Sequence, residues 1–261
     1  MPVLDTNLGG IHYALDGQPG NTVLVLSNSL GTNFSMWDSQ VAEFLKSFRV
    51  LRYDTRGHGK SAVTPGSYSM EQLAKDVLAV ADSLKIDSFH FCGLSMGGQT
   101  GMWLGANSSQ RLKKLVLCST GAKIGAAEMW NARIDAVRKN GMKEVATGAI
   151  ERWFTPAFRQ KNPPAIAAIR TVLEQTSPEG YAASCAAVRD FDFRKRLGEI
   201  RSPTLVVSGT HDAATTPADG HFLADHIPGA RYVELNGAHL CNVEDAQAFT
   251  RGVSGFLNSP S

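Results

Sequence analysis

Short apolar runs of strand length alternate with helical stretches along this chain of 261 residues, and this alternation limits the folds open to it. The run Val23-Leu24-Val25-Leu26 contains no polar residue, which is typical of a parallel strand covered on both faces. The expected strands lie at residues 11–15, 23–27, 48–53, 88–93, 114–118, 204–209 and 231–235, with helices at 37–47, 70–84, 96–107, 217–226 and 244–257. These units predict an α/β protein with a mostly parallel, doubly wound sheet.

Strand-like runs disappear between residues 121 and 197. The segment instead contains helical patterns, interrupted by prolines, at residues 126–140, 142–154, 165–174 and 181–188. We therefore expect residues 121–197 to form a small helical cap over the carboxyl edge of the sheet. The core of the fold would then consist of residues 1–120 and 198–261.

The composition excludes several function classes. The net charge is only +2, which gives no basis for binding nucleic acid or a membrane surface. No apolar run approaches the ~20 residues that a spanning helix needs, and the N-terminal residues do not resemble a secretory signal. The cysteines are far apart and show no metal-binding spacing, which predicts a reduced, cytoplasmic setting; they are Cys92, Cys118, Cys185 and Cys241.

The motif Gly93-Leu94-Ser95-Met96-Gly97 directly follows an expected strand and precedes an expected helix. In this context Gly-x-Ser-x-Gly resembles the nucleophile elbow of the α/β-hydrolase fold. Such a turn exposes the serine hydroxyl and strains its backbone, and its glycines allow strand and helix to approach closely. Ser95 is therefore the expected nucleophile of an acyl-transfer reaction.

A serine hydroxyl needs a neighbouring base, and in α/β-hydrolases an acid and then a histidine follow the nucleophile in the chain. Asp212 comes just after the expected strand 204–209, and His239 comes just after 231–235. Both fall at the carboxyl edge of a parallel sheet, where ligands bind in open α/β folds. We expect His239 to act as general base and Asp212 to orient its imidazole.

Other residues compete for these roles. Asp54 also ends a strand, but a turn-capping or ion-pair role is expected for it because the turn Arg56-Gly57-His58-Gly59 follows. Among the other histidines, a core position is expected for His90, a turn position for His58 and an outward direction for His211. Surface positions are expected for His12, His221 and His226.

Two backbone N–H groups should stabilise the oxyanion of the tetrahedral intermediate. One is that of Met96, at the start of the helix after the nucleophile. The other should come from the loop after residues 23–27, where many α/β-hydrolases have His-Gly and an apolar residue. This chain has Asn28-Ser29-Leu30 instead, and we expect the Leu30 N–H to serve.

Five blocks of this sequence together resemble 3-oxoadipate enol-lactonases: residues 26–40, 53–61, 93–105, 209–220 and 237–245. The most specific are NSLGTNFSMWD and THDAATTP. The resemblance implies hydrolysis of a small anionic enol-lactone to 3-oxoadipate in the β-ketoadipate branch of bacterial aromatic catabolism. It implies no metal or cofactor, and it leaves the oligomeric state open.

An anionic substrate predicts a cation in the pocket. Trp130 and Arg133 share one face of the first cap helix, and Trp153 lies in the second. The hypothesis is that Arg133 pairs with the substrate carboxylate while both indoles line the pocket. The alternative is that Arg133 is solvated and the tryptophans pack the cap against the core.

Other functions remain open. Serine at position 95 argues against haloalkane dehalogenases and epoxide hydrolases, which have aspartate there. Carboxylesterases, perhydrolases and C–C bond hydrolases share the triad. A ligand-binding receptor of the same fold is a further alternative, against which the complete set of Ser95, Asp212 and His239 argues.

Overall fold

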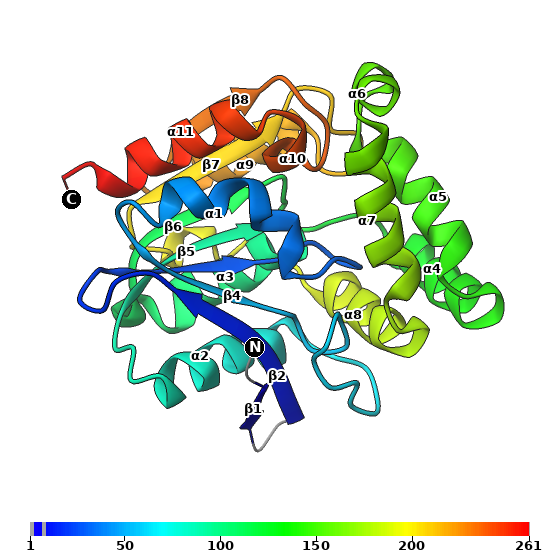
Figure 1. Cartoon of the computed structure of the whole chain (residues 1–261), viewed down its shortest axis with the longest axis horizontal. Helices are drawn as coiled ribbons and strands as arrows, with labels where there is room; N and C mark the ends of the chain where they lie inside the picture. Colours follow the sequence, from blue (N-terminus) through cyan, green and yellow to red (C-terminus); the bar gives the residue numbers. More distant parts are fainter. Residues whose placement is uncertain (1–2, 7–8, 261) are drawn as a thin grey trace.

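In residues 3–6 and 9–260, the part of the chain that the computed structural model describes, eight strands form one sheet in the order β1-β2-β4-β3-β5-β6-β7-β8. Strands β3 to β8 run parallel to one another, whereas β2 is antiparallel to β1 and β4. Helices cover both faces of the sheet (Figure 1). The predicted α/β class is confirmed.

The strands are β1 (Val3–Thr6), β2 (Gly9–Asp16), β3 (Val23–Ser27), β4 (Arg49–Tyr53), β5 (Phe89–Leu94), β6 (Leu112–Cys118), β7 (Thr204–Gly209) and β8 (Arg231–Leu235). The core helices are α1 (Asp38–Phe44), α2 (Met70–Ser83), α3 (Met96–Asn107), α9 (Pro217–His226), α10 (Cys241–Glu244) and α11 (Ala246–Asn258). Between β6 and β7 lie α4 (Ala127–Asn140), α5 (Met142–Trp153), α6 (Pro156–Lys161), α7 (Pro163–Gln175) and α8 (Pro178–Asp190), called the cap helices below.

Alternate residues of the central strands face opposite sides of the sheet. In β3, Val23 and Val25 join a hydrophobic cluster with residues of α2 and α3, while Leu24 and Leu26 join a second cluster with residues of α1 and α11. Every residue of β3, β5 and β7 is buried. Burial on both faces explains why these strands are continuous apolar runs rather than alternating ones.

The cap helices lie together beside one end of the sheet (right in Figure 1). They contribute to both hydrophobic clusters, Ile134 and Val137 to the first and Ala149 and Ile150 to the second. Their division from the core as a separate domain, residues 121–197, stays a prediction.

The prolines of this segment begin helices rather than separate them. Pro156, Pro163 and Pro178 are the first residues of α6, α7 and α8. Proline is well suited to that position because the N–H it lacks would have no intrahelical acceptor. The helices expected at 165–174 and 181–188 were therefore placed too late in the sequence, and α6 was not expected.

Three further boundaries differ from expectation. The helix expected at 244–257 is two helices, α10 and α11, separated at Asp245, whose side chain accepts a hydrogen bond from the Ala248 N–H (3.4 Å). The helix expected at 37–47 is a 3₁₀ turn, Phe34–Trp37, followed by α1. Strand β1 was not expected; it pairs with β2, which is longer than the predicted 11–15.

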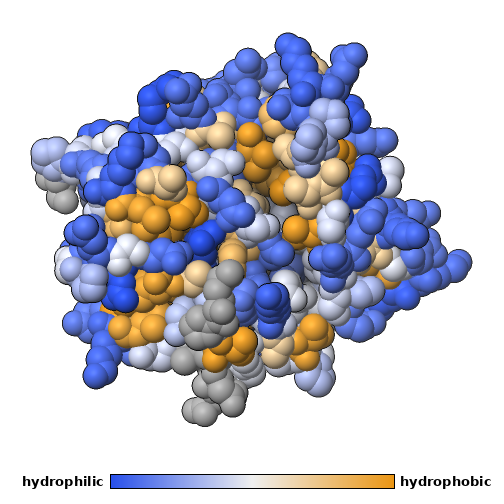
Figure 2. All heavy atoms as spheres, viewed as in Figure 1, coloured by the Kyte–Doolittle hydropathy of each residue, from blue (hydrophilic) through white to orange (hydrophobic). Residues whose placement is uncertain are grey.

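Hydrophilic residues cover most of the face in Figure 2, with hydrophobic patches between them. In the described ranges, no helix is both long and apolar enough to cross a membrane. All four cysteines are free and buried. Cys92 and Cys118 lie on adjacent strands with their sulfur atoms 3.8 Å apart.

Candidate active site

Ser95 occupies a strained turn between β5 and α3. Its backbone has φ 57° and ψ −112°, outside the helical and extended regions. A Cβ on Gly93 would lie 2.1 Å from the carbonyl oxygen of Gly97, and one on Gly97 would lie 2.3 Å from that of Ser27. The predicted strain and the predicted need for both glycines are confirmed.

Asp212 and His239 meet at the carboxyl edge of the sheet, in the loops after β7 and β8. His239 Nδ1 lies 2.8 Å from Asp212 Oδ2, and both residues are buried. The Ala214 and Thr215 N–H groups donate to Asp212 Oδ1 at 2.8 and 3.0 Å, and Thr215 Oγ1 donates to Oδ2 at 2.8 Å. The carboxylate is thus held by four hydrogen bonds.

These contacts decide the charge of Asp212. Burial alone would raise the pKa of this carboxyl, but the neighbouring His239 and the hydrogen bonds from His239 and Thr215 outweigh burial and hold the pKa below its usual value. An ionised Asp212 that accepts a hydrogen bond from Nδ1–H fixes the tautomer in which Nε2 carries a lone pair. That is the form a general base requires.

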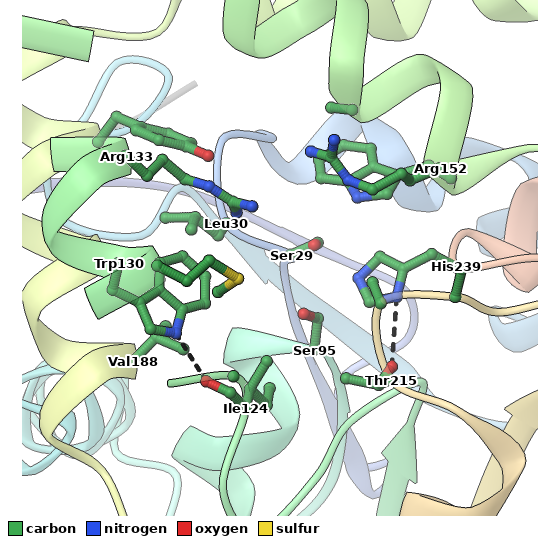
Figure 3. A pocket seen from close by; sticks show the side chains of 17 residues that line it. Ser29, Leu30, Ser95, Ile124, Trp130, Arg133, Arg152, Val188, Thr215 and His239 are labelled. Atoms are coloured by element: carbon green, nitrogen blue, oxygen red, sulfur yellow. Dashed lines mark hydrogen bonds between the residues drawn. The ribbon is translucent and has the colours of Figure 1, made fainter. Parts of the chain in front are cut away.

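Ser95 and His239 line the same cavity, of about 160 Å³, and face each other across it (Figure 3). Asp212 lies behind the imidazole, on its Nδ1 side. The structure thus brings the three predicted residues to one place. Their catalytic roles stay a prediction, developed below.

The two N–H groups expected to bind an oxyanion have free donors. Among the described residues, neither the Leu30 N–H nor the Met96 N–H donates a hydrogen bond. Their neighbours are occupied: the Gly31 N–H donates to His58 Nε2 (2.9 Å), and the Gly97 N–H donates to the Asn28 carbonyl (3.1 Å). Leu30 also lines the cavity, so this pair stays the candidate oxyanion hole.

His58 and Asn28 support the Leu30 loop, which the sequence analysis did not foresee. Burial lowers the pKa of His58, so its imidazole is neutral and Nε2 can accept from Gly31. The Asn28 side chain donates to the Tyr53 carbonyl (2.7 Å) and accepts from Trp37 Nε1 (3.0 Å). An asparagine whose amide is bonded at both its nitrogen and its oxygen thus holds this loop.

The competing residues have structural roles. Asp54 caps its turn, accepting from the Phe34 and Lys60 N–H groups (both 2.9 Å), and it pairs with His12 Nδ1 at 2.7 Å, as the capping or ion-pair interpretation predicted. The expected surface position of His12 was wrong, because this pair with a residue 42 positions away buries it. His90 is in the core as expected, although its Nδ1 has no hydrogen-bond partner among the described residues.

The upper part of the cavity is formed by cap helices α4 and α5. Trp130, Arg133 and Trp153 all line it, in agreement with the hypothesis. Trp130 is nevertheless also a packing residue, because its Nε1 donates to the Ile124 carbonyl at 2.6 Å (Figure 3). The Trp153 ring lies 5.7 Å from the His239 ring, so it also covers the imidazole.

Arg152 is a further lining residue, which the sequence analysis missed. In Figure 3 its guanidinium points into the cavity from the side opposite Arg133. Burial, and then the positive charge of Arg133, lower the pKa of Arg152. Neither arginine forms an ion pair with a carboxylate in the described part of the chain. The lining residues include no Asp, Glu or Cys, so this set suits an anion rather than a metal cation.

Comparisons with known proteins agree with this site. The family profile of the α/β hydrolase fold matches residues 22–145. The 3-oxoadipate enol-lactonase 2 of Acinetobacter baylyi is 43% identical over 247 residues, which cover 95% of this chain and 92% of the relative. The chain belongs to the 3-oxoadipate enol-lactonase family of α/β-hydrolases. The family resemblance predicted from the sequence is confirmed.

Two further relatives support membership of this enol-lactonase family. The 3-oxoadipate enol-lactonase 1 of the same organism is 37% identical over 259 residues, covering 98% of this chain and 97% of the relative. The crystal structure of the enol-lactonase from Burkholderia xenovorans superimposes with a TM-score of 0.98 at 48% identity, covering 99% of this chain and all of the other. The enol-lactonase family member described here is therefore a hydrolase.

Proposed function

We propose that this protein opens 3-oxoadipate enol-lactone to 3-oxoadipate, with Ser95 as the nucleophile. The observation that carries the proposal is the pair of guanidinium groups, Arg133 and Arg152, that face the cavity containing Ser95 (Figure 3). Two positive charges in a partly apolar cavity, neither paired with a carboxylate of the described residues, favour a small anionic substrate. The relatives are named as enol-lactonases, two of them for 3-oxoadipate enol-lactone, which is a small anionic lactone.

The acylation step follows from the arrangement of the side chains. Ser95 Oγ attacks the lactone carbonyl carbon while its proton passes to His239 Nε2, and Asp212 stabilises the resulting imidazolium. The N–H groups of Leu30 and Met96 hold the oxyanion. The ring C–O bond then breaks, and the ring oxygen leaves as an enolate. The enolate carbon takes up the proton that the His239 imidazolium gives up, so the ketone forms and the imidazole is neutral again. Because an enolate is a good leaving group, this step needs little acid assistance.

Deacylation uses the same groups, with water in place of Ser95 as the nucleophile and Ser95 as the leaving group. His239 takes a proton from water, the hydroxide attacks the acyl carbon, and the Ser95 C–O bond breaks. The imidazolium returns its proton to Ser95 Oγ, and the product leaves with a new carboxylate. Each step balances without a metal ion or an organic cofactor.

Arg133 and Arg152 would bind the carboxymethyl group that the lactone carries throughout. Arg133 lies over the Trp130 ring (4.6 Å to its centroid), which fixes the direction of the guanidinium. We place the reaction in the β-ketoadipate route of aromatic catabolism. The four free, buried cysteines support a proposed cytoplasmic location.

The direct test is an absorbance assay of enol-lactone loss. We expect kcat/KM for 3-oxoadipate enol-lactone to exceed that for p-nitrophenyl acetate by about 100-fold or more, because a neutral ester leaves both guanidinium groups unpaired. The same lactone with its carboxylate blocked as the methyl ester is the matched control, and it should behave like the neutral ester.

Two results would count against the proposal. Lactone loss no faster than the spontaneous rate, with p-nitrophenyl acetate still hydrolysed, would indicate a carboxylesterase. Equal turnover of the lactone and its methyl ester would show that the substrate carboxylate is not recognised.

A further inference from the structure

Glu244 has no role in the reaction as described above, yet its carboxylate contacts two segments that the reaction needs. It is the last residue of the short helix α10, five positions after His239, and it is half-buried. One segment it contacts is the loop that carries His239. The other is the chain just after cap helix α5.

One carboxylate therefore joins core and cap. Glu244 Oε2 accepts from the N–H of Ala238, the residue before His239, at 2.9 Å. Glu244 Oε1 accepts from the N–H of Thr155 at 3.2 Å, and it also accepts from the Thr155 hydroxyl. Thr155 lies two residues beyond the end of α5.

A second contact holds the same two segments together on the other side of the histidine. The Leu240 N–H donates to the Trp153 carbonyl at 3.2 Å. The Trp153 ring lies 5.7 Å from the His239 ring. Residues 153–155 and residues 238–240 thus form a junction with His239 at its centre. Glu244 is the side chain that binds both of these segments.

Helix α5 also carries Arg152 into the cavity, one residue before this junction. The part of the cap that would bind the substrate carboxylate is therefore attached directly to the loop that orients the imidazole. We infer that Glu244 is a positioning residue, which sets His239 relative to Ser95 by fixing its loop to the end of α5. This inference rests on the proposed role of His239 as general base, but not on the identity of the lactone.

The physical reason is geometric. Asp212 fixes the rotation of the imidazole through Nδ1, but it does not fix the backbone that carries the ring. A displacement of about 1 Å of a catalytic group can lower a rate by up to about 100-fold. Holding the backbone on both sides of His239 prevents such a displacement during acylation and deacylation alike.

Thr155 allows the most specific test, because its hydroxyl donates to Glu244. The same hydroxyl accepts from the Phe158 N–H (3.2 Å) and so also caps α6, and the loss of that cap should lower Tm rather than kcat per site. Thr155→Val removes the hydroxyl and keeps the size and branching of the side chain, while Thr155→Ser keeps the hydroxyl and is the matched control. An open hollow of about 600 Å³ borders Thr155 and Glu244, so a methyl group can be accommodated. Glu244→Gln, which keeps one acceptor oxygen, is the second variant.

The measurement is kcat per active site, titrated with a fluorophosphonate, on both the enol-lactone and p-nitrophenyl acetate. We expect Thr155→Val to lower kcat about tenfold on both substrates, Glu244→Gln to lower it by a similar factor, and Thr155→Ser to retain at least half of it. Normalising to titrated sites removes any loss that comes from unfolded protein.

Unchanged kcat per site in Thr155→Val and Glu244→Gln, with only a lower Tm, would overturn the inference and leave Glu244 a stabilising residue. An equal loss in Thr155→Ser and Thr155→Val would also overturn it, because the hydroxyl would then be irrelevant. Failure of the proposed substrate is distinguishable, since it would abolish lactone turnover in the unsubstituted protein while the variants could still be compared on p-nitrophenyl acetate.

Discussion

The carboxyl edge of the sheet and the cap helices hold their functional side chains in different ways. At the sheet edge, backbone contacts fix the site: Ser95 donates its N–H to the Cys118 carbonyl (2.9 Å), and Asp212 accepts two backbone N–H groups. On the cap helices, Arg133 and Arg152 extend into the cavity as side chains without a carboxylate partner among the described residues.

This difference suggests a division of roles, in which the sheet edge carries out the reaction and the cap helices select the substrate. Groups fixed by backbone contacts and strand ends can act on any acyl carbon presented to them. Cationic side chains that extend from helix faces select which molecule binds there. Substitutions at the sheet edge should therefore affect all substrates, whereas substitutions on the cap helices should affect only those with a carboxylate.

The largest effect is expected at the nucleophile. Ser95→Ala should lower kcat by about 10⁴-fold or more on the lactone and on a neutral ester alike, because nucleophile and base act as a unit. Circular dichroism and Tm should stay close to those of the unsubstituted protein. Residual turnover above about 1% on either substrate would show that Ser95 is not the nucleophile.

A smaller and selective effect is expected from the arginines. Arg133→Met and Arg152→Met should each raise KM for the lactone about tenfold, because each removes one charged hydrogen bond to the carboxylate. The kcat/KM for p-nitrophenyl acetate should stay within about twofold. Arg170→Met, on the exposed face of α7, is the control for loss of a positive charge outside the cavity.

An unchanged KM in Arg133→Met would leave Arg133 as a solvated residue, the alternative left open by its sequence position. A loss on both substrates would remove the distinction between the two regions.

Trp130 tests whether a cap residue can serve both packing and binding. Trp130→Phe leaves the buried Ile124 carbonyl without its donor, and we expect the free energy of unfolding to fall by about 1–2 kcal/mol. Arg133 would also lose the indole beneath it, so KM for the lactone should rise about threefold. A lower stability with unchanged KM would assign Trp130 to packing alone.

The smallest effect concerns the core. Burial, and then the charges of Lys114 and Lys113, lower the pKa of His90 to about 4. The unfolded chain, with a pKa near 6.5, takes up a proton that the folded state does not, so the free energy of unfolding falls as the pH falls from about 6.5 to 4.

His90→Leu should reduce the loss of stability between pH 7 and pH 5, measured by urea unfolding, by about 1–2 kcal/mol. Activity should not change. An unchanged pH dependence would mean that His90 is protonated in the folded protein.

The sheet-edge site could be predicted because it depends on local patterns. Ser95 lies between a recognisable strand and helix, and Asp212 and His239 follow two other apolar strands. Parallel strands end at one edge of a sheet, so residues far apart in the sequence were expected to meet there. That expectation needed no knowledge of side-chain packing.

The rest depends on contacts that no local pattern records. Arg152 enters the cavity because of how α5 packs on the core, and only its proximity to Trp153 in the sequence could have suggested it. His12 is buried by Asp54, and Glu244 binds a residue 89 positions away. The contacts of His12 and Glu244 are polar contacts between distant segments, and the spacing of hydrophobic residues does not predict such contacts.

The sharing of both hydrophobic clusters by the cap helices limits how this enzyme can evolve. Deleting the cap helices would expose apolar residues of both hydrophobic clusters at once. A replacement segment would therefore have to pack against both clusters. Single substitutions on the sides of α4 and α5 that face the cavity are a more accessible route to new specificity. They change how substrate binds and leave both hydrophobic clusters intact.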